Sequence, residues 1–381
     1  MKCFKNAAAY VEGSGLVRCA VEFDETIAFI GDSSFAEEIP LPAGAVVLPG
    51  FVDQHVHGAG GADGMDGSVE ALTTISQTLA KEGTASFLVT TMTQSKENIL
   101  NALKAVKTFR EGQNTGARAL GVHLEGPFIS PKYKGAQPLQ YVTLPDVKTF
   151  DEYNAASGNS IKIVTLAPEA EGAEELIRHL KSNGIVASIG HTGAGVEEVQ
   201  RAIQCGASNV THTYNAQSAL HHREIGAVGS AMLFDELNCE MIADAIHVSV
   251  PAMRLLVKSK PKDKLTLITD AMRAKGLPDG VSELGGQTVY VKNGQARLAD
   301  GTLAGSVLKM NRALQNVVEK LGVSFTQAVD SATINPAKNL GLDGEIGSIK
   351  VGKRTDFTVL NKNYDVLYTI VGGKIVYSAE N

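Results

Sequence analysis

The sequence has few cysteines, no excess of positive charge and no long apolar run, and each absence excludes a class of protein. Only four of the 381 residues are cysteines, and their positions show no paired spacing. A disulfide framework or a cysteine-based zinc site is therefore not indicated, and we expect buried free thiols in a reducing compartment. The formal net charge of -6 argues against a general nucleic-acid-binding protein. An anionic small substrate stays compatible with this charge, because a few local Arg residues suffice to bind it.

The sequence also lacks the apolar segments that direct a chain into or across a membrane. Its first residues mix polar and apolar side chains, unlike the core of a signal peptide, and no later run is long enough to span a bilayer. We therefore expect a cytoplasmic protein without a membrane partner. A chain of 381 residues exceeds the usual size of one core, so we expect a large domain with a smaller one attached.

Both ends of the chain contain short strand patterns separated by polar or glycine turns. These patterns cover residues 9–47 and 356–377. We expect the two ends to pair into one small β-sandwich domain of residues 1–48 and 340–381. The intervening residues 49–339 alternate short apolar runs with amphipathic segments, which is typical of repeated βα units.

Eight apolar runs in this central part are candidate parallel strands. They cover residues 47–52, 85–91, 119–124, 161–167, 185–189, 209–213, 240–246 and 265–269. Helical patterns lie between them, and Ser68 and Ser95 are candidate N-caps of two of these helices. Parallel strands joined by helices and closed on themselves form a TIM-like barrel. An open doubly wound sheet is the alternative, but that fold usually has a Gly-rich phosphate loop after its first strand, where this chain has Gln54 and two histidines.

The segment after the eighth strand has its own turn signals. Asn293-Gly294 lies between alternating apolar positions and predicts a β-hairpin. The small-residue stretch 301–306 follows, and its backbone could approach a ligand closely. Two helical patterns, at 307–321 and 324–332, complete the core before Asn335-Pro336 stops the helical pattern.

Histidines follow the first predicted strand. His55 and His57 are two residues apart, so on a strand both imidazoles share a face and can reach one metal ion. Two histidines in a solvated loop are the ordinary interpretation of such a pair. Their place at a strand end, before a run of glycines, favours the metal site, because barrel enzymes carry their chemistry at that edge.

Three further strands end in potential metal ligands: Glu125, His191 and His212. Taken singly, a salt-bridged Glu or a structural His is the ordinary interpretation. Together they form a His-His-carboxylate set, which is the composition of a catalytic zinc or iron site with an open position for water. A bound cation would compensate the buried charge of Glu125, and such a site generates hydroxide near neutral pH.

Two more polar residues follow the last predicted strands. Asp270 comes after a fully apolar run and could cap a helix, or it could take a proton from an activated water and pass it to a leaving nitrogen. His247 follows the seventh strand and could orient a substrate or polarise its carbonyl group.

The loop after the sixth strand is polar throughout. Residues 215–217 and 221–224 could simply be solvated. The functional alternative is a clamp for an anion, because the guanidinium group of Arg223 can bind phosphate through two hydrogen bonds.

This ordered set of motifs resembles the amidohydrolase superfamily and, within it, the deacetylase family that acts on N-acetylglucosamine 6-phosphate. The stretches that carry the resemblance are residues 49–58, 123–128, 190–192, 212–216, 222–224, 244–248, 269–271 and 301–306. The resemblance implies a TIM-like barrel with a terminal β-sandwich, usually a homodimer. It also implies hydrolysis of the acetamide to glucosamine 6-phosphate and acetate. The implied cofactor is one or two divalent metal ions, with zinc expected first and iron, manganese or cobalt as alternatives.

The resemblance assigns roles by position. It implies that the main metal ligands are Glu125, His191 and His212. It makes Asp270 the catalytic acid and base, and His247 a histidine that orients the substrate.

The same resemblance implies the contacts with the sugar phosphate. They fall on Asn215, Ala216, His222, Arg223 and His247. The Arg of this family can reach across a dimer interface.

The chain departs from parts of the family at two places. Some members lack the first histidine pair and use one metal, whereas His55 and His57 are both present here, so that a second metal can bind. The family's usual Phe-Asn-Ala-Met is Tyr-Asn-Ala-Gln in this chain, which puts the polar Gln217 in place of Met.

Two other functions stay open at this point. A cyclic-amide hydrolase of the dihydroorotase type commonly bridges two metals through a carboxylated Lys at the end of the fourth strand. The only candidate, Lys162, is near that strand's beginning, and Glu125 is better placed to bridge. The other alternative is a non-catalytic scaffold, although every ligand position that a hydrolase needs is occupied.

Overall fold

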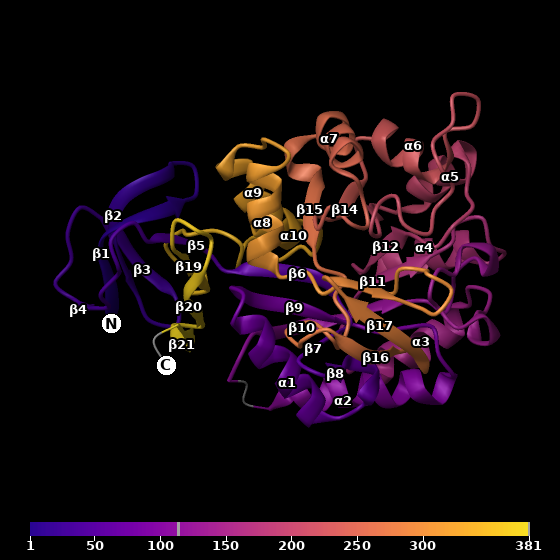
Figure 1. Ribbon diagram of the computed structural model, residues 1–381, viewed down its shortest axis with the longest axis horizontal. Coiled ribbons are helices and arrows are strands. Elements are labelled where there is room, and N and C mark those ends of the chain that lie inside the picture. The colour runs from indigo at the N-terminus through magenta and orange to yellow at the C-terminus, as the bar shows by residue number, and fades with distance from the viewer. Residues whose placement is uncertain (113–114, 380–381) are drawn as a thin grey trace.

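The larger part of the protein is a barrel of eight parallel strands. The computed structural model describes residues 1–112 and 115–379 (Figure 1). The barrel strands are β6 (Phe51–Val56), β9 (Thr84–Thr90), β10 (Arg118–Glu125), β11 (Ile161–Leu166), β12 (Val186–Ile189), β13 (Asn209–Val210), β14 (Asn238–Ile242) and β15 (Leu265–Ile268). Each pairs with the next along the chain, and the amide of Asp270 donates to the carbonyl of His55 at 2.8 Å, which brings the last strand to the first. The predicted TIM-like barrel is therefore confirmed.

Three of the predicted strands differ from the structure by more than one residue at an end, and one of them, predicted at 209–213, is only Asn209–Val210. Residue 47 belongs to β5 (Val46–Pro49), which lies in the other sheet, and the barrel strand begins only at Phe51. Between them Gly50 passes so close to the barrel that a Cβ there would lie 2.4 Å from that of Ala85. The predicted strand 240–246 is shifted to 238–242, because the chain turns away before Ala245, which has a φ of 63°.

All helices but the last surround the barrel on its outer side, whereas the last one clusters through Ala337 with Val52 and Leu88 of the barrel strands. The helices are α1 (Val69–Ala80), α2 (Lys96–Glu111), α3 (Val147–Ala156), α4 (Ala173–Ser182), α5 (Val196–Cys205), α6 (Gly226–Leu233), α7 (Val250–Ser259), α8 (Met310–Glu319), α9 (Phe325–Ala332) and α10 (Ile334–Asn339), with short 3-10 turns η1 (Gly64–Asp66), η2 (Pro131–Tyr133), η3 (Leu139–Tyr141) and η4 (Lys262–Lys264). Ser68 and Ser95 cap α1 and α2 as predicted. Helix α4 shows the typical amphipathic pattern: Leu176 and Leu180 are buried, whereas Arg178 faces solvent. No helix among these described residues is long and apolar enough to cross a membrane.

The predicted stop at Asn335-Pro336 is wrong. Helix α9 ends at Ala332, as the predicted pattern 324–332 does, and its C-cap Thr333 has a φ of -134° and a ψ of -82°, which break the helical path. The short helix α10 then starts at Ile334 with Pro336 in its first turn, where the missing N–H of proline is not needed.

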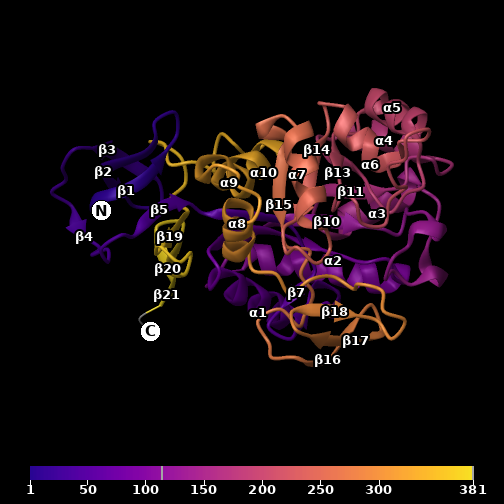
Figure 2. The same cartoon turned by 45° about the horizontal axis from the view of Figure 1, so that its top comes forward.

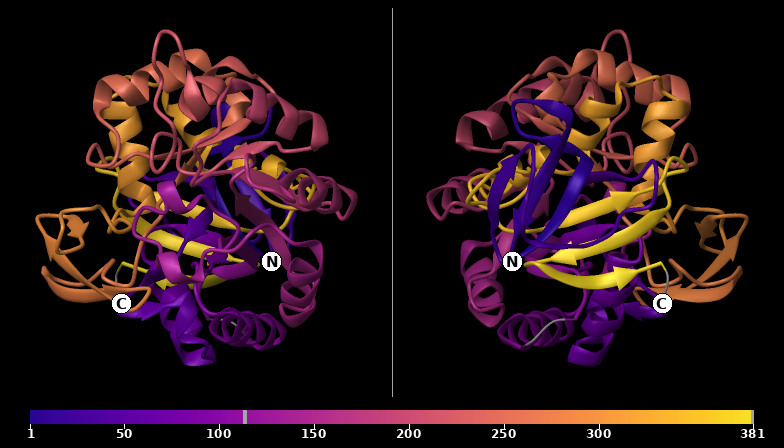
Figure 3. Two further views of the ribbon diagram at one scale, coloured as in Figure 1. Left: turned by 90° about the vertical axis from the view of Figure 1, so that its right-hand side faces the viewer. Right: turned by 90° about the vertical axis from the view of Figure 1, so that its left-hand side faces the viewer.

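The two ends of the chain form a second sheet, as predicted. Its strands are β1 (Lys2–Val11), β2 (Gly15–Phe23), β3 (Ile27–Gly31), β4 (Glu37–Glu38), β5, β19 (Phe357–Leu360), β20 (Val366–Val371) and β21 (Lys374–Ser378). Antiparallel pairing of β5 with β19 joins the two ends, and the right-hand view of Figure 3 shows the N- and C-terminal strands side by side. Phe4, Phe23 and Phe357 meet in its core, with ring centroids 5.2 to 6.0 Å apart. The exact division of the chain at residues 48 and 340 stays a prediction.

A three-stranded insert follows the last barrel strand. It consists of β16 (Gly280–Leu284), β17 (Gln287–Lys292) and β18 (Gln295–Arg297), and Figure 2 shows it beside β7 (Gly58–Ala59), which pairs with β8 (Ala62–Asp63) in a small hairpin. Asn293 and Gly294 have φ values of 52° and 75°, which confirms the predicted hairpin. Leu284 and Val289 of the insert pack with Met92 and Met272. This packing holds the insert against the barrel and near the site described next.

Candidate active site

A cavity of about 220 Å³ opens where the barrel strands end. Its lining includes most of the residues predicted from the sequence: His57, Glu125, His191, His212, Asn215, Ala216, His247 and Asp270. The insert contributes Leu284, and the small-residue stretch contributes Thr302, Leu303 and Gly305. A larger cavity, of about 790 Å³, lies between β1 and α9 and contains none of the predicted site residues. The candidate chemistry is therefore concentrated in the smaller cavity.

Glu125 is the last residue of β10 and is 2% exposed. Its Oε1 lies 3.1 Å from Nε2 of His212 and 3.4 Å from Nε2 of His191. The two histidine nitrogens are themselves 3.1 Å apart. These three side chains offer ligand atoms that all lie within 4.8 Å of one another, so they could hold one metal ion.

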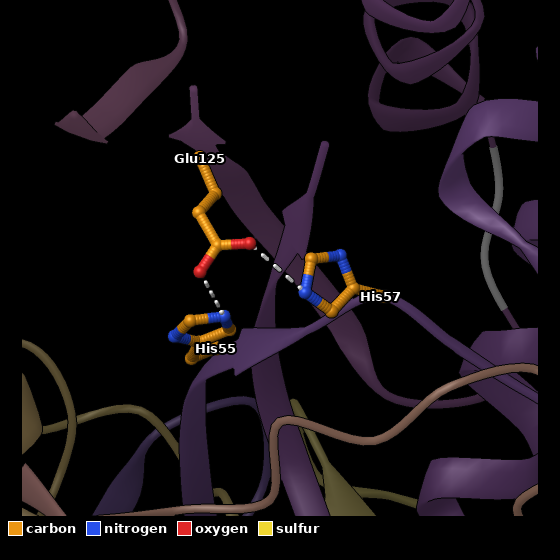
Figure 4. Close-up of side chains that lie close together, drawn as sticks. All are labelled: His55, His57 and Glu125. Carbon is orange, nitrogen blue, oxygen red and sulfur yellow. Dashed lines mark ion pairs between the residues drawn. The ribbon is translucent and has the colours of Figure 1, made fainter. Parts of the chain in front are cut away.

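The same carboxylate also faces the first histidine pair (Figure 4). Its Oε1 lies 3.4 Å from Nε2 of His55, and its Oε2 lies 3.3 Å from Nε2 of His57. Asp270 completes this second group, because its Oδ1 lies 3.5 Å from His55 and 3.3 Å from His57. Glu125 is thus common to two groups of potential ligands.

The charges of this site favour a cation. Burial disfavours a charged imidazole, yet the carboxylates of Asp270 and Glu125 raise the pKa of His55, and they raise the pKa of His57 to about 9. Burial likewise opposes ionisation of Glu125, but the neighbouring histidines hold its pKa well below the usual range. His55 Nε2 is buried and has no hydrogen-bond partner among the described residues. Imidazole nitrogens gathered around ionised carboxylates are the donor set of a divalent metal site.

Three of the histidines and carboxylates that line the cavity have an unusual backbone conformation. His191, His212 and Asp270 have φ values of 49°, 30° and 47°, in the left-handed region that side chains other than glycine rarely adopt. Each follows the end of a barrel strand, where the turn directs its side chain into the cavity. Such strained positions persist when the surroundings fix them, and they cluster at functional sites.

Two neighbouring groups orient the potential ligands. The ring of His191 donates from Nδ1 to the carbonyl of Tyr133 at 2.9 Å, which leaves Nε2 free to face Glu125. Gln137 donates from Nε2 to Oε2 of Glu125 at 2.7 Å. No sequence pattern pointed to Gln137, because it lies in a loop twelve residues beyond Glu125.

Two buried polar residues inside the strands were also missed. His123 lies two residues before Glu125, and its ring meets that of His55 edge to face, with centroids 4.5 Å apart and an interplanar angle of 68°. Glu240 lies within β14, is 0% exposed and contacts the ring of His55. A signal for both was present, since each is a polar side chain inside an otherwise apolar run.

His247 lies on the cavity wall and is held by an acidic neighbour. Its Nδ1 donates to Oδ2 of Asp244 at 2.6 Å, and Oδ1 of Asp244 accepts the amides of Ile246 and His247. Burial disfavours the charged ring, but Asp244 outweighs burial and raises the pKa of His247. The other ring nitrogen, Nε2, is left for a ligand in the cavity.

The polar loop after β13 divides into two parts. Gln217 does not line the cavity: its Oε1 accepts the amide of Tyr214 and its Nε2 donates to the carbonyl of Thr211, on either side of His212. His222 and Arg223 are exposed and lie outside the cavity, in the loop that projects ahead of α6 (Figure 1). Within one chain, therefore, the structure does not bring these last two residues to the site.

Comparison with known proteins agrees with this geometry. The sequence model of the amidohydrolase family matches residues 46–376. The chain belongs to the amidohydrolase family. It is 46% identical over 346 residues to the N-acetylglucosamine-6-phosphate deacetylase of Bacillus subtilis, which covers 90% of this chain and 87% of that protein.

Solved amidohydrolase structures have the same fold. The N-acetylglucosamine-6-phosphate deacetylase of Pasteurella multocida superposes with a TM-score of 0.93 at 31% identity, over 98% of this chain and 99% of that one. A mutant of the Mycobacterium smegmatis deacetylase, in complex with N-acetyl-D-glucosamine 6-phosphate, superposes with a TM-score of 0.90 at 29% identity, over 99% of both chains.

Proposed function

We propose that this amidohydrolase is an N-acetylglucosamine-6-phosphate deacetylase, which releases acetate and leaves glucosamine 6-phosphate. The proposal rests mainly on Glu125, whose carboxylate contacts both the His191–His212 pair and the His55–His57 pair. Asp270 lies beside the second pair, 3.3 Å from His57. The likeness to deacetylases across nine-tenths of the chain supports the substrate.

The metal ligands in this proposal are Glu125, His191 and His212, with His55 and His57 available for a second ion. A divalent metal, zinc by first expectation, would polarise the acetamide carbonyl and lower the pKa of a bound water. Asp270 takes the proton of the attacking water at its carboxylate and returns it to the departing amine. Asp270 must be ionised to accept this proton. Burial opposes its ionisation, but the charge and hydrogen bonds of His55 and His57 outweigh burial and lower the pKa of Asp270 to about 2.

The rest of the cavity orients the sugar phosphate. His247, with Nδ1 fixed by Asp244, presents Nε2 to the substrate. Asn215 and Ala216 line the cavity and contact the sugar phosphate in this proposal. Because Arg223 lies outside the cavity of its own chain, the proposal includes a homodimer in which Arg223 of the partner subunit binds the phosphate. The proposed location of this dimer is the cytoplasm.

The direct test is acetate release from N-acetylglucosamine 6-phosphate by the purified protein supplied in turn with zinc, iron, manganese and cobalt. We expect turnover with at least one metal and much weaker turnover of the free sugar. No turnover with any metal would overturn the proposal. Bound metal without turnover would then favour a cyclic-amide hydrolase, and absence of bound metal would favour the scaffold. For the cyclic-amide alternative, Lys162 is the second residue of β11 and so lies far from the end of that strand.

A further inference from the structure

A buried carboxylate, Glu240, lies behind the candidate metal ligands in the middle of β14. Its Oε1 accepts hydrogen bonds from Nε2 of Gln54 at 2.7 Å and from Nδ2 of Asn209 at 3.3 Å. Its Oε2 accepts from Nδ1 of His55 at 3.0 Å and from the backbone amide of His212 at 3.1 Å. One carboxylate therefore contacts a residue of each ligand group.

Contact with Glu240 fixes how His55 faces the cavity. Because the carboxylate accepts at Nδ1, the ring carries its proton there, and Nε2 is left to point at Glu125 and Asp270. The other candidate ligand histidines differ. His191 donates to a neutral carbonyl, and Nδ1 of both His57 and His212 has no hydrogen-bond partner among the described residues.

Glu240 is itself held in place by neighbouring amides. Asn339 donates from Nδ2 to Oε1 of Gln54 at 3.1 Å and to Oδ1 of Asn209 at 3.2 Å. Asn238 also donates to Oδ1 of Asn209, at 2.6 Å. Both amide partners of the carboxylate are thus bonded in turn, so Glu240 has little freedom to turn away from His55.

The charge around His55 also depends on Glu240. Three buried carboxylates, Glu125, Asp270 and Glu240, surround this ring, and within the described part of the chain all their ion-pair partners are histidines. With neutral imidazoles, one divalent cation would leave the group with one net negative charge, and this charge favours a second cation. Without the charge of Glu240, a single divalent cation would already neutralise the group.

We propose that Glu240 is a positioning residue for the second metal position: it holds His55 with Nε2 toward the cavity and contributes the charge that allows a second divalent cation to bind between His55, His57 and Glu125. The inference rests on the metal-dependent function proposed above, but it concerns the number of bound ions and not the substrate.

The test compares metal binding by Glu240→Gln with that of the unchanged protein and of Asp356→Asn. Asp356 is a suitable control because it is a carboxylate only 7% exposed and lies directly before β19, where its Oδ1 accepts from the amide of Gly372 and pairs with Arg354. We measure ions per chain by mass spectrometry after dialysis, and cobalt affinity by calorimetry. The unchanged protein and the control should bind two ions, whereas Glu240→Gln should bind the second one about 10- to 100-fold more weakly.

Further variants separate this role from a purely structural one. Glu240→Asp keeps the charge and should keep more of the second-site affinity than Glu240→Gln, so it also serves if Glu240→Gln fails to fold. A double-mutant comparison tests whether Glu240 acts through His55. In a His55→Gln background, adding Glu240→Gln should lower cobalt affinity little further, because the residue that Glu240 orients is already absent. Two ions bound with unchanged affinity by Glu240→Gln would overturn the inference, as would a single ion in the unchanged protein. A protein with the expected metal binding but no acetate release would instead overturn the proposed function.

Discussion

Gln137 donates from Nε2 to Oε2 of Glu125 at 2.7 Å, while its own Oε1 accepts the amide of Thr93 at 2.7 Å. Both ends of this amide are therefore used, and the loop after β10 is joined through it to the chain after β9. The contact fixes the carboxylate that faces both histidine groups. Gln137 is thus a structural support of the candidate metal site.

Gln137→Met should remove the hydrogen bonds to Glu125 and Thr93 and keep a side chain of similar size. We expect metal affinity or kcat to fall about 10- to 100-fold, which is typical when a residue that orients a metal ligand is lost. Steady-state kinetics and metal analysis measure both quantities. Gln140→Met is the matched control, because Gln140 is exposed in the same loop. Unchanged kinetics and metal content in Gln137→Met would show that Glu125 does not need the contact.

Glu125→Gln and Asp270→Asn should have distinguishable effects. Loss of the Glu125 charge removes the carboxylate common to both ligand groups, so metal content and activity should fall together. Asp270→Asn should lower kcat by about 10,000-fold or more, because the amide cannot take up and return a proton. Its main metal should stay bound, since the His191–Glu125–His212 group does not contain Asp270. Loss of this metal from Asp270→Asn would assign Asp270 to metal binding and not to proton transfer.

The barrel and most of the site could be predicted because their signals are local. Each βα unit has its own periodicity, and the carboxyl ends of parallel strands meet at one edge, so Glu125, His191 and His212 had to come together once the strands were placed. Residues whose role depends on contacts between distant segments could not be predicted in this way. Glu240 meets His55 across the barrel interior, and Gln137 reaches Glu125 only because its loop folds back.

The position of Gln217 also required the structure. From the sequence it could have been a polar group beside the sugar, but both ends of its amide bind the backbone on either side of His212. We therefore predict that Gln217→Met lowers the stability of the protein by about 1–3 kcal/mol, since one buried and one half-buried backbone group lose their partner. Metal affinity should fall with it, because His212 has a strained φ of 30° that this contact helps to hold. Thermal unfolding and cobalt titration test this, and a change confined to KM for the sugar would contradict it.

Arg223 provides a test of the proposed homodimer. If Arg223 of one subunit serves the cavity of the other, Arg223→Ala should raise KM for the phosphorylated sugar about 10- to 100-fold and leave that for the free sugar unchanged. A mixture of Arg223→Ala and Asp270→Asn subunits should then recover activity, because a mixed dimer contains one cavity with both groups intact. Random pairing would restore about a quarter of the sites. No recovery after verified subunit exchange would place Arg223 in its own subunit's site or outside the site.

Asp244 and His247 should make part of the stability of the protein depend on pH. Asp244 raises the pKa of His247 against the effect of burial, so the ion pair stabilises the fold below the unfolded pKa of histidine, about 6.5, and this contribution is lost as pH rises through the folded pKa. The pKa of Asp244 is lowered, since its bonds to His247 outweigh burial, so its own contribution is present above the unfolded pKa of about 3.9.

The difference in melting temperature between the unchanged protein and Asp244→Asn should therefore be larger at about pH 5.5 than at about pH 9. Part of the difference should persist at the higher pH, because Asp244 also accepts the amides of Ile246 and His247. The other histidines are the same in both proteins, so their contributions to the pH dependence of the melting temperature largely cancel in this difference. Equal differences at both pH values would mean that Asp244 acts only through the backbone. In that case His247 would not be held as a charged ring, and its proposed orientation toward the substrate would lose its electrostatic basis.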